Sequence, residues 1–297
     1  MSRRSEGAVK LLKELLFENK LTAVGLVGVI GFLVLALVEG VSLGRLTPYN
    51  PSAINLMEAN LPPSPAHLFG TNFEGQDIFS RVLAAIPIDM GLPIIIVALS
   101  ALIGLLLGSI AAYFRGVLDE AIARVTDVFL AFPGIIMALA VAATLGPSLI
   151  NATLAILFVW WPPYVRLVRG RALEVVSQDF ISASKALNTR FPYILWRGII
   201  PNVLPSVLVY ATMDVGTALL SLSTLGYLGL IPPTRPELGS MVASIGLNLY
   251  TYPWEALLPA FVVFLIVLCF SLLGDGLREM LDVKVRPHIL IREKVEE

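Results

Sequence analysis

The segment SQDFISASKALNTRFPYILWRGIIPNVLP, residues 177–205, decides the fold of the whole chain. It is the longest polar-rich interruption in the second half of a very apolar sequence. Ser177 is suited to cap a helix. Phe180, Ala183 and Leu187 then recur at the spacing of one helical face. Two interpretations fit this pattern: a structured elbow that binds a partner, or a loop that rests on lipid headgroups.

A turn and a second helix are predicted to follow the first helix of this segment. Asp179 lies where the positive first turn of the first helix favours an acidic side chain. Asn188 tolerates the left-handed backbone with which many helices end. Thr189 is suited to cap the second helix, and Pro192 is tolerated in its first turn.

The composition is that of an integral membrane protein. Of the 297 residues, 57% are hydrophobic and only 14% are charged, and the mean hydropathy is +0.82. Soluble domains carry about 25% charged residues. The single cysteine, Cys269, implies no disulfide framework, and the two histidines, His67 and His288, are far apart. The sequence has no metal-ligand cluster, phosphate-binding loop or nucleophile elbow, so it does not indicate an enzyme.

Six apolar segments are long enough to cross a hydrocarbon core of about 30 Å. Pro133 and Gly134 are expected to kink the third of them. The fourth ends in Trp160, Trp161 and Tyr164, which are typical of an interfacial aromatic belt. The chain is therefore predicted to be all-α, with spans at residues 21–43, 91–114, 126–145, 149–165, 203–220 and 254–273.

Three further segments lie outside these spans. Residues 1–20 mix leucines with lysines and predict an amphipathic leader on the cytoplasmic membrane surface, in contact with lipids. Residues 44–90 form an extracytoplasmic segment in which Glu74, Asp77 and Arg81 are spaced for capping or pairing. Residues 277–297 form a charged cytoplasmic tail.

The basic residues predict the orientation of the chain in the membrane. With the N-terminus inside, the outer segments hold only Arg45, Arg81 and Arg235. The other eighteen of the 21 Lys and Arg residues then lie on the cytoplasmic side, as the positive-inside rule requires. We therefore expect a multi-pass plasma-membrane protein with both termini in the cytoplasm, where the elbow also lies.

Asp214 is the most informative residue within a predicted span. It lies near mid-depth of the fifth span, where a carboxylate costs at least about 2.5 kcal/mol to insert. Tyr210, Thr217 and Ser221 are its polar neighbours in the sequence. The functional interpretation is a translocation pathway that meets a polar solute. The structural alternative is a buried carboxylate that is bonded to a hydroxyl group or held protonated.

Several motifs resemble one family. QDFISASKALN (178–188), followed by RGIIPNVLPSVL (197–208), is similar to the cytoplasmic EAA loop of ABC importer permeases. Three other stretches resemble the branch of this family that contains dipeptide and oligopeptide permeases. The resemblance as a whole covers residues 19–282. These stretches are FGTNFEGQDIFSRVL (69–83), LGYLGLIPPTRPELGSMV (225–242) and SLLGDGLREMLD (271–282).

The resemblance implies a fold and a set of partners. The fold would be a type I ABC importer permease core of five helices at residues 91–276, with a coupling loop at 177–202, behind a first transmembrane helix at 21–43. The partners would be a second, DppB/OppB-like permease, two ATPase subunits and an extracytoplasmic solute-binding protein, with no nucleic acid. ATP and Mg²⁺ would bind the ATPases, and this chain would carry no cofactor and hydrolyse no ATP.

The solute implied by the resemblance is a dipeptide or oligopeptide, with oligosaccharides as the alternative that the same branch includes. A remote alternative is an ion-coupled secondary carrier that uses Asp214. Leu222 stands near a position where many relatives carry a glutamate.

In the family, the short helix of the EAA loop docks into a groove of the ATPase. The glutamate-alanine-alanine core of that loop appears here as Ser182, Ala183 and Ser184, and the following glycine appears as Asn188. The loop thus loses the charge of the family's glutamate but keeps its backbone shape. We therefore expect it to dock on the ATPase by close packing. The ATPase-coupling residues implied by the resemblance are Asp179, Ser182, Ala183, Ser184, Lys185, Ala186, Leu187 and Asn188.

Overall fold

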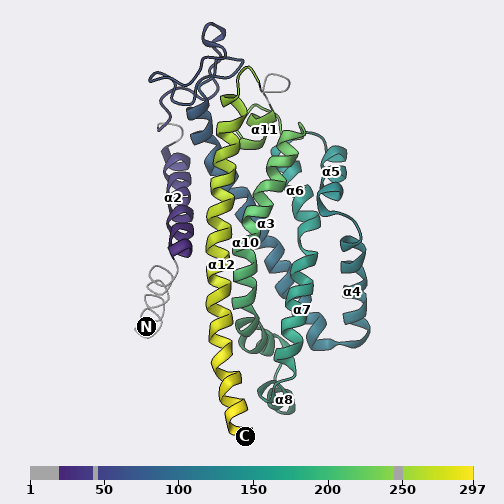
Figure 1. Ribbon diagram of the computed structural model, residues 1–297. Helices are drawn as coiled ribbons and strands as arrows, with labels where there is room; N and C mark the ends of the chain where they lie inside the picture. The colour runs from purple at the N-terminus through teal and green to yellow at the C-terminus, as the bar shows by residue number, and fades with distance from the viewer. Residues whose placement is uncertain (1–19, 43–45, 244–249, 297) are drawn as a thin grey trace.

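The protein is a bundle of helices. The computed structural model describes residues 20–42, 46–243 and 250–296, and the side chains up to residue 280. In these ranges the one β contact is an isolated bridge between Thr71 and Asp77. The elements (Figure 1) are α2 (Lys20–Ser42), η1 (Leu56–Glu58), α3 (Ile78–Phe114), α4 (Gly116–Leu130), α5 (Gly134–Leu145), α6 (Leu149–Trp160), α7 (Pro162–Val176), α8 (Asp179–Ala186), α9 (Phe191–Ile194), the π-helical turn η2 (Leu195–Ile199), α10 (Ile200–Tyr227), α11 (Leu238–Ala243) and α12 (Trp254–Glu296). The predicted amphipathic leader lies outside the described residues except for Lys20.

Four helical stretches of the described chain are long and apolar enough to cross a membrane. A fifth candidate is the pair α4 and α5, which bends by 82° between Leu130 and Gly134. The predicted kink at Pro133 and Gly134 is therefore confirmed. It divides the predicted span at 126–145 into two helices, because Pro133 removes a helical N–H group at the bend. The four long stretches are Lys20–Ser42, Ile78–Phe114, Phe191–Tyr227 and Trp254–Met280.

The fourth predicted span, residues 149–165, also differs from the structure. Helices α6 and α7 meet at Trp161, whose backbone is still helical, and α7 continues to Val176. The helix therefore continues eleven residues beyond the predicted end of the fourth span at residue 165. Arg169 of α7 forms a bidentate ion pair with Asp119 of α4, with Nη2 2.7 Å from Oδ2, and this pair joins the two helices.

Helix α3 begins thirteen residues before the predicted start of the second span, at Ile78 instead of residue 91. Its start is set by Asp77, whose Oδ2 accepts the N–H of Ser80 at 2.8 Å. The expected capping function of Asp77 is thus confirmed. Arg81 donates to the carbonyl oxygen of Pro51 at 3.0 Å instead of forming an ion pair with Asp77.

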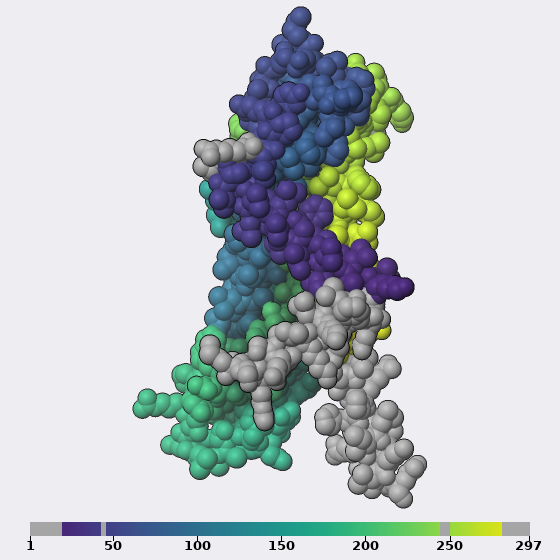
Figure 2. Space-filling model, turned by 90° about the vertical axis from the view of Figure 1, so that its left-hand side faces the viewer, coloured from purple at the N-terminus to yellow at the C-terminus, as the bar shows by residue number. Residues whose placement is uncertain are grey.

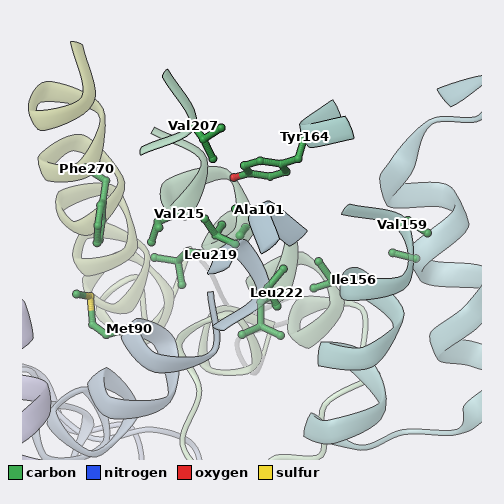
Figure 3. Packing of buried hydrophobic residues seen from close by; sticks show 14 of the residues in the cluster. Met90, Ala101, Ile156, Val159, Tyr164, Val207, Val215, Leu219, Leu222 and Phe270 are labelled. Carbon is green, nitrogen blue, oxygen red and sulfur yellow. The ribbon is translucent and has the colours of Figure 1, made fainter. Parts of the chain in front are cut away.

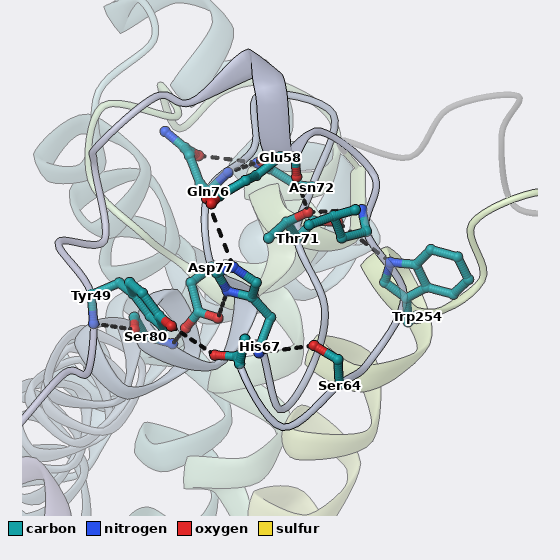
Figure 4. A network of polar contacts seen from close by, with 12 residues as sticks. Tyr49, Glu58, Ser64, His67, Thr71, Asn72, Gln76, Asp77, Ser80 and Trp254 are labelled. Atoms are coloured by element: carbon teal, nitrogen blue, oxygen red, sulfur yellow. Dashed lines mark hydrogen bonds and ion pairs between the residues drawn. The ribbon is translucent and has the colours of Figure 1, made fainter.

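A polar network orders the segment before α3 (Figure 4). The Nδ1 atom of His67 lies 2.9 Å from Oδ1 of Asp77, and Tyr49 packs its ring against the imidazole at 4.7 Å. The indole N–H of Trp254 donates to the carbonyl oxygen of Thr71 at 3.4 Å. This segment therefore forms a structured cap that is bound to the first turn of α12.

The apolar core lies among α3, α6, α7, α10 and α12 (Figure 3). Tyr164 and Leu222 are fully buried in it. Gly104 lets α7 approach α3, because a Cβ atom there would lie 2.3 Å from that of Tyr164.

Helix α2 lies at the edge of this core, to which it contributes Val29, and packs along α12 (Figures 1 and 2). Glycines make the contact close. A Cβ atom at Gly25 would lie 2.6 Å from the backbone nitrogen of Leu273, and one at Gly276 would lie 2.0 Å from the hydroxyl oxygen of Thr22. Most other side chains of α2 are partly or fully exposed, as expected of a helix that faces lipid.

Candidate functional site

The elbow contains a short helix, α8, but neither predicted cap forms. Ser177 ends α7 instead of starting α8, and its hydroxyl donates to the carbonyl oxygen of Glu174 at 2.8 Å. Gln178 precedes α8, and Arg190 occupies the capping position of α9 that was predicted for Thr189. The capping predictions for Ser177 and Thr189 are therefore wrong. Helix α7 extends to Val176 and places Ser177 at its end, and α9 begins one residue later than a Thr189 cap requires.

The turn after α8 follows the prediction. Asn188 has a φ of 55°, in the left-handed region, and its N–H donates to the carbonyl oxygen of Lys185 at 2.9 Å. Pro192 lies in the first turn of α9, also as predicted. The π-helical turn η2 then leads directly into α10, so no loop separates the end of the elbow from the long helix.

One side of α8 is fixed to the rest of the protein. Ile181 is 1% exposed and packs over Gly198, where a Cβ atom would lie 2.9 Å from Cδ1 of Ile181. The Nζ atom of Lys185 lies 4.4 Å from the centre of the Tyr113 ring, at the end of α3. Displacement of α8 would therefore act on both η2 and α3.

The other side of α8 is apolar and exposed. Phe180 is 44% exposed and Leu187 is 81% exposed, and Ala183 lies exposed between them on the predicted common face. Ser182 and Ala186 are also exposed, whereas the hydroxyl of Ser184 donates to a backbone carbonyl group. This face lies at the end of the bundle opposite the polar cap (Figure 1).

A polar stripe follows one face of α10. Tyr210, Asp214, Thr217 and Ser221 are separated by four, three and four positions, so they share one helical face. Tyr210 and Thr217 are exposed, and Asp214 and Ser221 are half-buried. The stripe lies within a stretch that is apolar enough to span a membrane. Because lipid disfavours such a face, the stripe needs a polar surrounding.

Asp214 is held by two aromatic donors that its neighbours in the sequence do not reveal. Its Oδ2 accepts the indole N–H of Trp160 at 2.7 Å and the hydroxyl of Tyr164 at 2.8 Å. Tyr210 packs edge-on against Tyr164, with ring centres 5.0 Å apart. Trp160 and Tyr164 therefore bind Asp214 instead of serving only as an interfacial belt. The signal in the sequence was two aromatic donors four residues apart at the end of one span.

The hydroxyl groups of Ser221 and Thr212 on α10 donate to backbone carbonyl oxygens instead of Asp214. Ser221 donates to the carbonyl oxygen of Thr217 at 2.9 Å, and Thr212 donates to that of Leu208 at 2.9 Å. Within the described residues, Asp214 forms no ion pair with a cation. The stripe therefore carries one carboxylate with two neutral donors, and its oxygen Oδ1 takes part in none of the described hydrogen bonds.

The fold is similar to that of a chain of the methionine ABC transporter MetNI, which was solved in inward-facing conformations. The TM-score is 0.57 with 18% sequence identity, over 68% of this chain and 97% of that one.

Residues 104–287 match the family described as "Binding-protein-dependent transport system inner membrane component", and the chain belongs to this family. It is 38% identical to the dipeptide transport system permease protein DppC of Haemophilus influenzae, over 93% of this chain and 95% of that one. It is 40% identical to the probable D,D-dipeptide permease DdpC of Escherichia coli, over 80% of each. Identity to the glutathione permease GsiD of Escherichia coli is 39%, over 86% and 85%. The chain is thus a multi-pass inner-membrane permease subunit of an ABC importer.

Proposed function

We propose that this chain forms one half of the translocation pathway of an ATP-driven importer of dipeptides or oligopeptides. The observation that carries the proposal is the stripe of α10, because it places Asp214 without a cation partner on a partly exposed face of a membrane helix. The relatives named for dipeptide and glutathione transport favour peptides over oligosaccharides. A peptide brings an ammonium group, which a carboxylate in a low-dielectric surrounding attracts.

The proposed transmembrane arrangement has six spans. They are α2, α3, the bent pair α4 and α5, the joined helices α6 and α7, α10 and α12. Both termini and α8 lie in the cytoplasm, and the cap before α3 lies outside. The excess of basic residues on the α8 side supports this orientation. Helix α2 stands outside a permease core at residues 91–276, and the coupling loop occupies 177–202.

The proposed partner at the stripe is a second, DppB/OppB-like permease. Tyr210, Asp214, Thr217 and Ser221 would face it across an aqueous path, which removes the stripe from lipid. An extracytoplasmic solute-binding protein would deliver the peptide to the outer end of this path. An ion-coupled carrier with Asp214 as its ion site has less support, because such a carrier leaves the exposed face of α8 without a function.

Two ATPase subunits are the proposed partners at α8. Its exposed face at Phe180, Ala183 and Leu187 would fill a groove in one ATPase, with Asp179, Ser182, Ser184, Lys185, Ala186 and Asn188 around the contact. ATP and Mg²⁺ would bind the ATPases, and this chain would hydrolyse no ATP. Movement of α8 would reach the pathway through Ile181 and η2, which lead into the helix that carries Asp214.

Reconstitution tests the proposal. The permease pair, the ATPases and the solute-binding protein are placed in proteoliposomes, and uptake of a labelled dipeptide is measured. We expect uptake that requires both ATP and the solute-binding protein. An equal concentration of a labelled oligosaccharide is the control solute. Uptake driven by an ion gradient without ATP, or uptake of the oligosaccharide alone, would contradict the proposal.

A further inference from the structure

The segment between α10 and α12 contains a buried glutamate, Glu237, that binds the backbone of α11, the helix that begins at the next residue. Oε1 of Glu237 accepts the N–H of Gly239 at 2.9 Å, and Oε2 accepts the N–H of Ser240 at 2.8 Å. Glu237 is 1% exposed. Gly226 of α10 provides the space, because a Cβ atom there would lie 2.2 Å from Oε2. Each carboxylate oxygen of Glu237 thus has a donor in a closed site.

A second buried carboxyl group, that of Asp89 in α3, meets Glu237. Asp89 is 1% exposed, and its Oδ2 accepts the N–H of Leu238 at 3.0 Å. Its Oδ1 is buried and has no donor among the described groups. The Glu237 carboxyl group is nevertheless within hydrogen-bonding reach of Asp89. Two ionised carboxylates have no hydrogen between them, so they would repel each other here.

We propose that Asp89 and Glu237 share one proton, and that the resulting hydrogen bond holds α11 against α3. The proton resides on Asp89, because Glu237 accepts two backbone N–H bonds that favour its ionised form, whereas Asp89 accepts one. The protonated Oδ1 of Asp89 donates to Glu237. This bond satisfies the orphan oxygen and leaves a single negative charge on the pair.

The charged groups around the pair do not take the place of the proton. Arg235 lines a cavity of about 300 Å³ together with Glu237, but it is exposed and forms no described ion pair with it. Arg81 of α3 and Glu255 of α12 line a neighbouring cavity of about 230 Å³, where the guanidinium of Arg81 donates to Pro51 and Gln76 instead of the pair. From α10, the pair is met by Gly226, which carries no charge.

The shared proton makes the contact between α11 and α3 depend on pH. Burial raises the pKa of Glu237 above its usual value, although its backbone N–H partners lower it in part. When α11 separates from α3, both carboxyl groups regain water and ordinary pKa values, and they bind fewer protons near neutral pH. Low pH therefore stabilises the form in which α11 is bound to α3. Rising pH weakens it by up to about tenfold per pH unit between the ordinary carboxyl pKa values and the raised pKa of the pair, and above that raised pKa the contact no longer depends on pH.

Hydrogen–deuterium exchange tests this proton site in the full-length chain, with its partner subunits, in lipid nanodiscs. The amides of Leu238, Gly239 and Ser240 report it directly, because they donate to the two carboxyl groups. Protection factors are corrected for intrinsic exchange and compared between about pH 5.5 and about pH 8.5. We expect wild-type protection to fall at least about tenfold over this range. Constant protection would overturn the proposal.

The variant Asp89→Asn keeps the hydrogen bond between the two side chains but removes its dependence on a titrating proton. The amide N–H of asparagine donates to Glu237 without titrating, and its oxygen still accepts from Leu238, so protection should be high at every pH. Glu255→Gln is the matched control. It removes another buried carboxyl group at the same end of the bundle and should keep the wild-type pH dependence. A wild-type profile in Asp89→Asn, or a flat profile in Glu255→Gln, would refute the shared proton. Because exchange does not measure transport, this result is independent of the solute.

Discussion

At the scale of single residues, the charge of Asp214 can be tested apart from its hydrogen bonds. Asp214→Asn keeps an acceptor oxygen for Trp160 and Tyr164 and removes the negative charge. We expect ATP-driven uptake to fall about tenfold, equivalent to ~1.4 kcal/mol, because the solute loses an electrostatic contact. Uptake is measured in proteoliposomes together with the yield of the assembled complex, which should not change.

Thr212→Ala is the control for this change. Thr212 lies on the same helix, but its hydroxyl is bonded to the carbonyl oxygen of Leu208. Its removal should leave uptake close to that of the wild type. Equal uptake by Asp214→Asn and Thr212→Ala would show that the charge of Asp214 has no part in transport.

The cap before α3 gives a prediction about stability. Asp77 accepts the N–H of Ser80 and binds His67, and both contacts are buried. Asp77→Ala should lower the free energy of unfolding by at least ~1 kcal/mol, because it leaves two buried polar groups without a partner. Thermal unfolding in detergent measures this loss. Glu74→Ala, which removes no described side-chain hydrogen bond, should have a clearly smaller effect.

The partners of Asp214 show what sequence reasoning at this scale could not provide. A mid-span carboxylate is visible in the sequence, and the need for a partner follows from the cost of burying charge. The partners themselves, Trp160 and Tyr164, lie 54 and 50 positions away in the chain. Helical spacing relates only residues within a few turns, so it could not predict how α6 and α7 pack against α10.

At the scale of elements, the exposed face of α8 is the feature to test. Ala183→Trp places a large ring on this face without changing the buried contact of Ile181. We expect binding to the ATPase to weaken at least about tenfold, while the permease itself stays folded. Co-purification with the ATPase and stimulated ATP hydrolysis measure the effect. Undiminished values of both would show that α8 does not dock.

Ser177→Ala is the matched control for the elbow. Ser177 ends α7 and does not cap α8, so its hydroxyl is not needed for the start of α8. ATPase binding should be retained in this variant. The comparison also explains the error of prediction, since a serine before an acidic residue fits both a helix start and a helix end. The turn at Asn188 was predictable because its backbone demand is strictly local.

At the scale of the whole molecule, the glycine contact between α2 and α12 is predicted to hold the outermost helix in place. Gly25→Leu should lower the melting temperature or detach α2, because even a Cβ atom would collide with the backbone of α12. Gly31→Ala is the matched control, since its new Cβ atom meets no atom within 4 Å. Equal melting temperatures and equal protease sensitivity of α2 in the two variants would contradict the close contact.

Hydropathy predicted the all-helical class and the approximate place of most apolar helices, since insertion into lipid depends on local composition. A kink at Pro133 and Gly134 was predicted from these residue types, but the size of the 82° bend between α4 and α5 and the early start of α3 were not. These features depend on a proline and on a cap that is built from distant parts of the chain.

The contact of α2 with α12 also has a consequence for biogenesis. The ribosome makes α2 early and α12 late, and almost the whole chain lies between them. During synthesis, the surface around Gly25 therefore enters the bilayer before the backbone that fits it exists. Lipid must cover the surface around Gly25 until α12 has been inserted. The contact between Gly25 and the backbone of α12 can therefore form only after α12 has been made, late in synthesis.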